Sequence, residues 1–353
     1  MKKFSFLRKA LALMLCTFTL LSFASCKDTS WVVSSGNESV GAGVYLGYLV
    51  DAYYTAANSV TDTTTDMFSQ KIGDVKVADY IKNTALENCK NYIVVNTLFD
   101  EFELSFSEAE KKNFEESFKS IWENVSSYYE ENGCGKESLK KILLNDEKYQ
   151  KVFEYYYGSK GKEPVSEKER KEYFTKNYAK IKYISVDYSN HFSGVSTSSD
   201  ASEAQKTELK ELAESYVERI KKGEDIDKLA DEESKAAAKL NKEEQEEHDH
   251  EHDHTYTFIQ KDTSDDPEDF NKKVFAADYS KPVLFENTTY GYYVFVRYKM
   301  DADSEDFTDR SGDVLSAMKS EDFAEVISKE VNKIKVTENS AAIKRFKPQN
   351  VIF

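Results

Sequence analysis

The chain has 353 residues and a formal net charge of −16, and charged side chains occupy 32% of its positions. A surface this acidic argues against nucleic-acid binding, which needs clustered basic side chains, and favours solubility beside an anionic envelope. The length allows two domains, and a composition poor in proline and glycine but rich in Lys and Glu predicts a largely helical protein.

The first 25 residues have the pattern of an export signal. Lys and Arg cluster within positions 2–9, and the apolar stretch 10–23 is too short to cross a bilayer as a stable helix. Small residues and then Cys26 follow, in the order "FASC", which resembles the end of a bacterial lipoprotein signal. This resemblance implies a lipid on Cys26, and a net charge of −20 once four positive charges leave with the signal. An ordinary secretory signal with an unrelated cysteine is the alternative.

The cysteines form no metal or redox motif. Cys16 leaves with the signal, and the sequence has neither a CxxC pair nor a Cys/His zinc spacing. The remaining two, Cys89 and Cys134, could pair as a disulfide in an exported protein. Because sequence spacing does not show whether they come close enough, both the paired and the free state stay open.

Residues 26–165 predict an N-terminal helical domain. Apolar residues recur at helical spacing from Val77 to Leu104. Ser107 and Glu110 form a Ser-x-x-Glu capping box that opens the next helix, and the glycines of "ENGCGK" end it. The other elements expected in this domain are a β-prone piece, a turn and an apolar helix within 30–58, and two shorter helices at 136–145 and 147–158.

A second capping box, Ser166 to Glu169, opens a connecting helix expected over 166–179. It leads into a region of mixed character, 180–300, which contains a very polar insertion at 239–254. The elements expected there are strands at 181–188, 256–260, 282–286 and 290–299, helices at 203–222 and 225–238, and a helix after Asp266-Pro267. A C-terminal segment, 301–353, then contributes a long helix over 312–335.

Three stretches of the mixed region carry a specific pattern. They are "KIKYISVDYS" (180–189), "ELAESYVERIKKGEDIDKLADEES" (211–234) and "DFNKKVFAADYSKPVLFENTTYGYYVFVRYK" (269–299). Together they resemble a parvulin-type prolyl isomerase, and the chain after the signal resembles the SurA/PrsA-type foldases. This resemblance implies an α+β protein with a mainly helical domain, similar to the chaperone domains of SurA and trigger factor, plus a small parvulin-like α/β domain. It also implies that the C-terminal helix packs on the N-terminal domain.

The positions that carry parvulin chemistry hold other residues. Tyr183 and Tyr293 stand where the resemblance implies two histidines, and Ala236 stands where it implies Cys or Asp. A tyrosine with an ordinary pKa of about 10 does not copy the proton chemistry of imidazole, so no catalytic residue is assigned. Phe270 matches the phenylalanine of the proline pocket. The expected substrate-binding residues are Phe270, Tyr183, Tyr293 and Phe258, and whether isomerase activity survives stays open.

The polar insertion holds four of the five histidines, in the run "HDHEHDH". Alternation places all four on one face of an extended segment, and neutral imidazoles suit Zn, Ni or Cu. We therefore expect no required cofactor, but a loose site for Zn or Ni. A disordered polar loop without metal is the alternative. The expected ligands are His248, His250, His252 and His254.

The sequence thus predicts a foldase or chaperone of the bacterial cell envelope, extracytoplasmic and lipid-anchored to the membrane. Its expected partners are unfolded exported proteins and the membrane, through the N-terminal lipid, with no nucleic acid and with homodimerisation left open. Two other functions stay open: an active peptidyl-prolyl isomerase, and a metal-binding lipoprotein that uses the His-rich loop. A solute-binding lipoprotein is disfavoured, because the chain lacks the alternating strands and helices of a two-lobed receptor.

Overall fold

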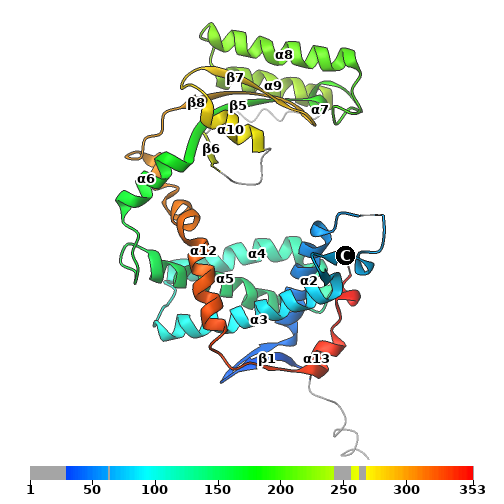
Figure 1. The fold of residues 1–353 in the computed structure, drawn as a ribbon, viewed down its shortest axis with the longest axis vertical. Helices are drawn as coiled ribbons and strands as arrows, with labels where there is room; N and C mark the ends of the chain where they lie inside the picture. Colours follow the sequence, from blue (N-terminus) through cyan, green and yellow to red (C-terminus); the bar gives the residue numbers. More distant parts are fainter. Residues whose placement is uncertain (1–28, 63, 242–255, 262–267, 353) are drawn as a thin grey trace, which may run out of the picture. The chain divides into compact units, whose positions relative to one another are not determined.

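A computed structural model describes residues 29–62, 64–241, 256–261 and 268–352. The chain divides into two compact units, Met1–Pro164 with Lys319–Phe353, and Val165–Met318. We call them the helical unit and the inserted unit, because the second interrupts the first in sequence (Figure 1). The later boundary falls inside one helix, α12 (Ser311–Val331), beyond the residue 300 suggested by the sequence.

The helical unit begins with a β-hairpin and continues with long helices. Its elements, in chain order, are β1 (Trp31–Ser35), β2 (Glu38–Gly41), α2 (Ala42–Ser59), the 3-10 helix η1 (Met67–Ser69), β3 (Lys71–Ile72), β4 (Val75–Lys76), α3 (Val77–Glu101), α4 (Glu108–Glu131) and α5 (Lys136–Tyr157), and after the inserted unit the rest of α12, β9 (Thr337–Glu338), α13 (Ser340–Arg345) and η2 (Pro348–Asn350). The capping box predicted for α4 is present. The Ser107 hydroxyl accepts the backbone N–H of Glu110, whose carboxylate accepts the N–H of Ser107.

The core of this unit lies between α2, α3 and α5. Tyr45, Leu49 and Ile81 are fully or almost fully buried there, as the apolar spacing of these segments predicts. Cys89 and Cys134 belong to the same core and are free thiols. The disulfide that the sequence left open is therefore not formed, and both cysteines act as small apolar core residues.

α5 is one continuous helix, where the sequence predicted two shorter helices that separate near residue 146. Asn145, a weak helix former, is buried, and its Nδ2 donates to the carbonyl of Tyr92 on α3 at 3.1 Å. This contact offsets the low helix propensity of asparagine. The prediction of a break was wrong, because packing against α3 stabilises the helical conformation at this position.

Both ends of the chain contribute to the helical unit. β9 pairs antiparallel with β1, and Nδ2 of Asn339 donates to the carbonyl of Trp31 at 3.0 Å, although the two residues are 308 positions apart. In the last part of α12, Phe323 is fully buried and meets Tyr149 of α5 edge-to-face, with ring centroids 4.8 Å apart. The first hairpin and the last residues thus complete one core.

The inserted unit is built on an antiparallel sheet of four strands, in the order β6-β5-β8-β7. Its elements are α6 (Glu167–Asn177), β5 (Tyr178–Asp187), α7 (Tyr188–His191), α8 (Glu203–Lys221), α9 (Ile226–Asn241), β6 (Thr257–Gln260), α10 (Glu268–Ala276), β7 (Pro282–Asn287), β8 (Gly291–Tyr298) and α11 (Glu305–Thr308), before the start of α12. α6 ends before the predicted residue 179, because Tyr178 already pairs with Gln260 of β6. Long helices together with small antiparallel sheets confirm the predicted α+β class.

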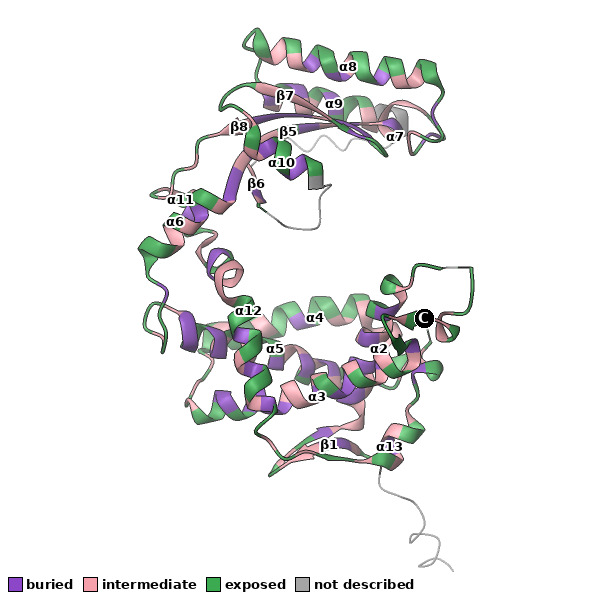
Figure 2. Ribbon diagram, viewed as in Figure 1, coloured by how far each residue is buried: buried purple, intermediate pink, exposed green. Residues whose placement is uncertain are grey.

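Different helices cover the two faces of this sheet. Successive strand residues point to opposite faces, so each strand contributes to both. Val186 packs in one cluster with Leu209 of α8, and Phe295 packs in another with Phe270 of α10. The central strands β5 and β8 carry many of the buried residues, as Figure 2 shows.

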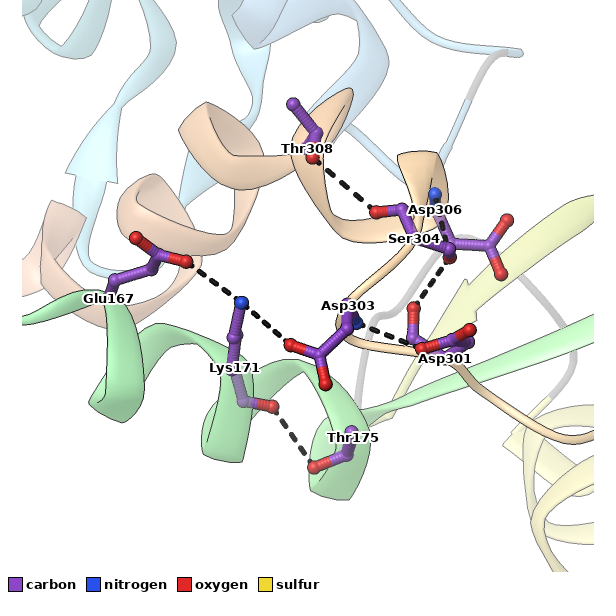
Figure 3. A network of polar contacts seen from close by, with 8 residues as sticks. All are labelled: Glu167, Lys171, Thr175, Asp301, Asp303, Ser304, Asp306 and Thr308. Atoms are coloured by element: carbon purple, nitrogen blue, oxygen red, sulfur yellow. Dashed lines mark hydrogen bonds and ion pairs between the residues drawn. The ribbon is translucent and has the colours of Figure 1, made fainter.

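A polar network joins α6 to the turn that precedes α11 (Figure 3). Nζ of Lys171 lies 2.8 Å from a carboxylate oxygen of Glu167 and 2.9 Å from one of Asp303. Ser304 caps α11, because its hydroxyl accepts the backbone N–H of Asp306. Solvent screens exposed ion pairs of this kind, so the network orders the turn more than it stabilises the unit.

Candidate functional site

Aromatic side chains gather on the face of the sheet that α10 covers. The antiparallel register places Phe295 opposite Tyr183. On the next pair of strands it places Phe285 opposite Tyr293. Residues that face each other across paired strands point to the same side, and α10 adds one more ring. We call this group the aromatic face: Tyr183, Phe270, Phe285, Tyr293 and Phe295.

Tyr293 is the common neighbour within the aromatic face. Its ring centroid lies 5.2 Å from that of Phe270 and 5.9 Å from that of Tyr183, both in edge-to-face geometry. It also stacks on Phe285, with centroids 6.2 Å apart. Aromatic pairs stabilise by about 0.5–1.5 kcal/mol beyond their burial, so the two tyrosines form a packed pair.

The aromatic face has a buried floor and an open rim. Phe270 and Phe295 are 4% and 0% exposed, whereas Tyr183 is 44% exposed. Phe285 and Tyr293 are half-buried. A partly exposed ring above a rigid apolar floor suits sequence-tolerant contacts with the apolar side chains of another polypeptide.

The turn between β7 and β8 orients Tyr293. Asn287 is buried, and its Oδ1 accepts the backbone N–H groups of Thr289 and Tyr290 at 3.0 and 3.1 Å. Its Nδ2 donates to the hydroxyl of Tyr293 at 3.4 Å. One amide thus closes the turn and positions the phenol.

A polar group lies at the end of β5. Oδ2 of Asp187 accepts the hydroxyl of Ser185 at 2.9 Å. Nε2 of His191 lies 2.6 Å from Oε1 of Glu233, whose Oε2 accepts the hydroxyl of Tyr216 at 2.9 Å. The pKa of Asp187 is raised, chiefly by burial and to a smaller extent by the Glu233 carboxylate. The hydrogen bond from Ser185 and the charge of His191 offset only part of this rise.

The structure brings together three of the predicted substrate-binding residues, Phe270, Tyr183 and Tyr293, but not the fourth. Phe258 pairs with Lys180 of β5. Lys180 and Tyr183 are an odd number of residues apart, so their side chains point to opposite faces of the sheet. The side chain of Phe258 therefore points to the other side of the sheet, where it packs in a cluster formed by α6 and α11. Phe258 does not belong to the aromatic face.

Of the other predicted positions, the structure describes only Ala236. Ala236 is exposed on α9. Five positions lie outside the described residues, so their roles stay predictions: Cys26, His248, His250, His252 and His254. Within the described ranges, no group of three or more His, Cys, Asp or Glu side chains could hold a metal ion. None of the described helices is long and apolar enough to cross a membrane.

Sequence reasoning missed Phe285, Asn287 and Asp187. The alternation of side chains along a strand could have found them, because every second residue points to the same face. On β5 this rule leads from Tyr183 to Asp187, and on β7 it leads from Val283 to Phe285 and Asn287. That signal becomes usable only once one residue of each strand is placed on a known face.

Comparison with known proteins agrees with this architecture. Residues 166–297 match the family model of the PPIC-type PPIase domain. The matched residues lie within the inserted unit, so this unit is similar to parvulin-type peptidyl-prolyl isomerase domains. The resemblance inferred from the sequence motifs is confirmed for this part of the chain.

Solved structures of foldases also match. The foldase protein PrsA from Streptococcus pneumoniae is 15% identical, with a TM-score of 0.39, over 82% of this chain and 98% of that one. The foldase protein PrsA from Lactococcus lactis is 14% identical, with a TM-score of 0.34, over 91% and 99% of the two chains. PrsA from Bacillus subtilis is 18% identical, with a TM-score of 0.29, over 78% and 86%. No curated protein matches the chain.

Proposed function

We propose that the protein is an extracytoplasmic foldase of the SurA/PrsA type that holds unfolded exported polypeptides, and that its parvulin domain binds them without isomerising proline. The observation that carries this proposal is the edge-to-face packing of Tyr183 against Tyr293, 5.9 Å between centroids, where two imidazoles would stand in an active parvulin. Prolyl rotation must cross a barrier of about 20 kcal/mol. Two packed phenol rings supply neither the acid nor the base of an imidazole pair.

Client binding would use the open rim of the aromatic face. An apolar side chain of an extended client would pack on the exposed ring of Tyr183, above the floor of Phe270 and Phe295. Each such contact contributes about 0.5–1.5 kcal/mol, so the client is held for a short time and released. The predicted lipid on Cys26 would keep the protein at the site of export, and the mass of the mature N-terminal peptide tests that anchor.

A paired assay on the chain without its signal segment tests the function. One arm follows cis/trans isomerisation of a proline test peptide, and the other follows aggregation of a denatured exported protein. We expect suppressed aggregation and no rate enhancement. Tyr183→Ala should weaken the suppression about threefold, by loss of one aromatic contact.

Glu286→Gln is the control for this variant. Glu286 is exposed on β7 and pairs with Tyr292, so it points away from the aromatic face. Suppression should be unchanged in this control. A rate enhancement by the wild-type protein that Tyr183→Ala abolishes would contradict the non-catalytic part of the proposal.

An active isomerase is the second candidate, and the placement of Phe270 favours it. This ring remains in the floor of the site, where the parvulin pattern has the proline-pocket phenylalanine. If the pocket still binds proline, the double variant Tyr183→His with Tyr293→His should gain isomerase activity. No gain would show that the pocket, as well as the chemistry, is lost.

A further inference from the structure

Asp187 continues the row of side chains at the rim of the aromatic face. On β5, Tyr183, Ser185 and Asp187 alternate onto one side of the sheet, and Ser185 stands opposite Tyr293 of β8. At about 3.3 Å per strand residue, Asp187 lies about 7 Å beyond Ser185 along β5. Its carboxylate is therefore next to the aromatic rim.

α10 covers the opposite end of this face. Its Phe270 and Val274 pack with Ala179 and Ile181, at the start of β5. On β8 and β7, Phe270 still contacts Tyr293 and Phe285, but on β5 the ring of Tyr183 is 44% exposed. Among the described elements, the open part of the face therefore lies along β5, from Tyr183 in the direction of Asp187.

Asp187 has no ion pair with any residue that the structure describes. Its Oδ2 is occupied by the hydroxyl of Ser185. The neighbouring imidazole of His191 is bonded to Glu233, which also accepts the hydroxyl of Tyr216. The carboxylate is half-buried near a second carboxylate, so a cation brought by a ligand would find an uncompensated charge there.

The inserted unit as a whole is strongly acidic. Between residues 165 and 318 the sequence has 36 Asp and Glu against 22 Lys and Arg, a net charge of −14, while the entire chain carries −16. This field attracts cationic segments of a client chain. A general field does not select a sequence, but a fixed carboxylate beside an apolar contact does.

We propose that Asp187 determines which client segments the aromatic face prefers: those with an apolar or aromatic residue on Tyr183 and Tyr293 and a lysine or arginine one or two residues away. This inference rests on the proposed function, because it requires clients to bind at the aromatic face. An extended client advances about 3.3 Å per residue, so a long basic side chain at either of these positions spans the interval to Asp187.

Binding of three labelled peptides, followed by fluorescence anisotropy on the chain without its signal segment, tests this preference. The peptides share an extended scaffold with one central Phe, flanked on both sides by Lys, by Gln or by Glu. We expect the Lys peptide to bind about fivefold more tightly than the Gln peptide, and the Glu peptide to bind most weakly. In Asp187→Asn, the Lys peptide should lose most of its advantage over the Gln peptide, and only the weaker attraction of the overall negative charge should remain.

Glu286→Gln is the matched control, because it removes one negative charge from the opposite face of the same sheet. It should keep the wild-type preference for Lys. Equal loss of the preference in both variants would assign it to bulk charge and overturn the role of Asp187. Equal binding of all three peptides by the wild type would overturn the inference alone, whereas no binding by any peptide would overturn the proposed function as well.

The wild-type protein supplies a second measurement that does not depend on the folding of a variant. The preference needs an ionised Asp187, so the ratio of Lys to Gln affinity should fall towards one as the pH drops through the raised pKa of this carboxyl. Protonation of Glu233 or His191 would act in the same direction, so the ratio in Asp187→Asn must stay flat over the same range. A wild-type ratio that is unchanged from about pH 8 to about pH 4 would overturn the assignment.

Discussion

At the scale of single residues, Gly291 shows how the backbone shapes the site. Its φ is +143°, in a region that other residues avoid. A Cβ atom there would overlap the carbonyl oxygen of Val186 on β5, which cannot rotate aside as a side chain could. Glycine therefore lets β8 start close to β5, and the next residues, Tyr292 and Tyr293, enter opposite faces of the sheet.

Gly291→Ala should lower the free energy of unfolding of the inserted unit by at least about 2 kcal/mol, because it adds backbone strain to a steric overlap. Urea denaturation followed by tyrosine fluorescence measures the change. Gly312→Ala is the control: it lies in the first turn of α12 with open space around it, and should be neutral or stabilising by up to about 1 kcal/mol. Similar effects of the two substitutions would argue against the close strand approach.

The structure brings three of the predicted substrate-binding residues together and places the fourth on the other face of the sheet. Tyr183, Tyr293 and Phe270 could be named because the parvulin pattern fixes their positions along the chain. Phe258 was misplaced because a strand residue's face depends on the register with its neighbour, here Lys180, and no local pattern sets that register.

At the scale of elements, a half-buried carboxyl links two helices of the helical unit. The hydroxyl of Tyr129 on α4 donates to Oδ1 of Asp51 on α2 at 2.6 Å. Burial raises the pKa of Asp51 above its ordinary value of 3.8, and the hydrogen bond from Tyr129 offsets only part of that rise. The folded unit thus favours the protonated carboxyl, and this contribution to stability is complete below pH 3.8 and is lost as the pH rises through the raised pKa.

Asp51→Asn should make the helical unit more stable at neutral pH and leave its stability nearly unchanged in acid, because the amide oxygen still accepts the Tyr129 hydroxyl and carries no charge. Tyr129→Phe should act in the opposite direction at neutral pH, by about 1–2 kcal/mol, because it leaves a partly buried carboxylate without its donor. Thermal unfolding across a series of pH values measures both. Destabilisation by Asp51→Asn at every pH would contradict the raised pKa.

At the scale of the whole molecule, the helical unit depends on residues from both ends of the chain. Val32 and Val33 of β1 are fully buried, and β9 and α13 close over that strand. The inserted unit, by contrast, has its own sheet and its own apolar clusters. We therefore expect two unfolding transitions that respond to different changes.

Deletion of residues 336–353 should lower the Tm of the helical unit by about 5 °C or more, because it exposes the apolar edge of β1. The transition of the inserted unit should stay in place. Differential scanning calorimetry separates the two. Asn339→Ala is the graded control, since it removes the side-chain bond to Trp31 and the cap of α13 without removing the strand. A uniform shift of both transitions would contradict the division into units.

The sequence by itself determined the α+β class, the order of most elements, the capping boxes at Ser107 and Ser166, and the presence of tyrosine at positions 183 and 293. These features depend on residue types and on neighbours a few positions apart. Only the tertiary structure decided that α5 is continuous, that Phe258 leaves the aromatic face and that Asp187 stands at its rim. Each of these depends on strand register or on packing between segments far apart in the chain. Contacts of this kind can override local propensity, and a short stretch of sequence does not contain both of the residues that make them.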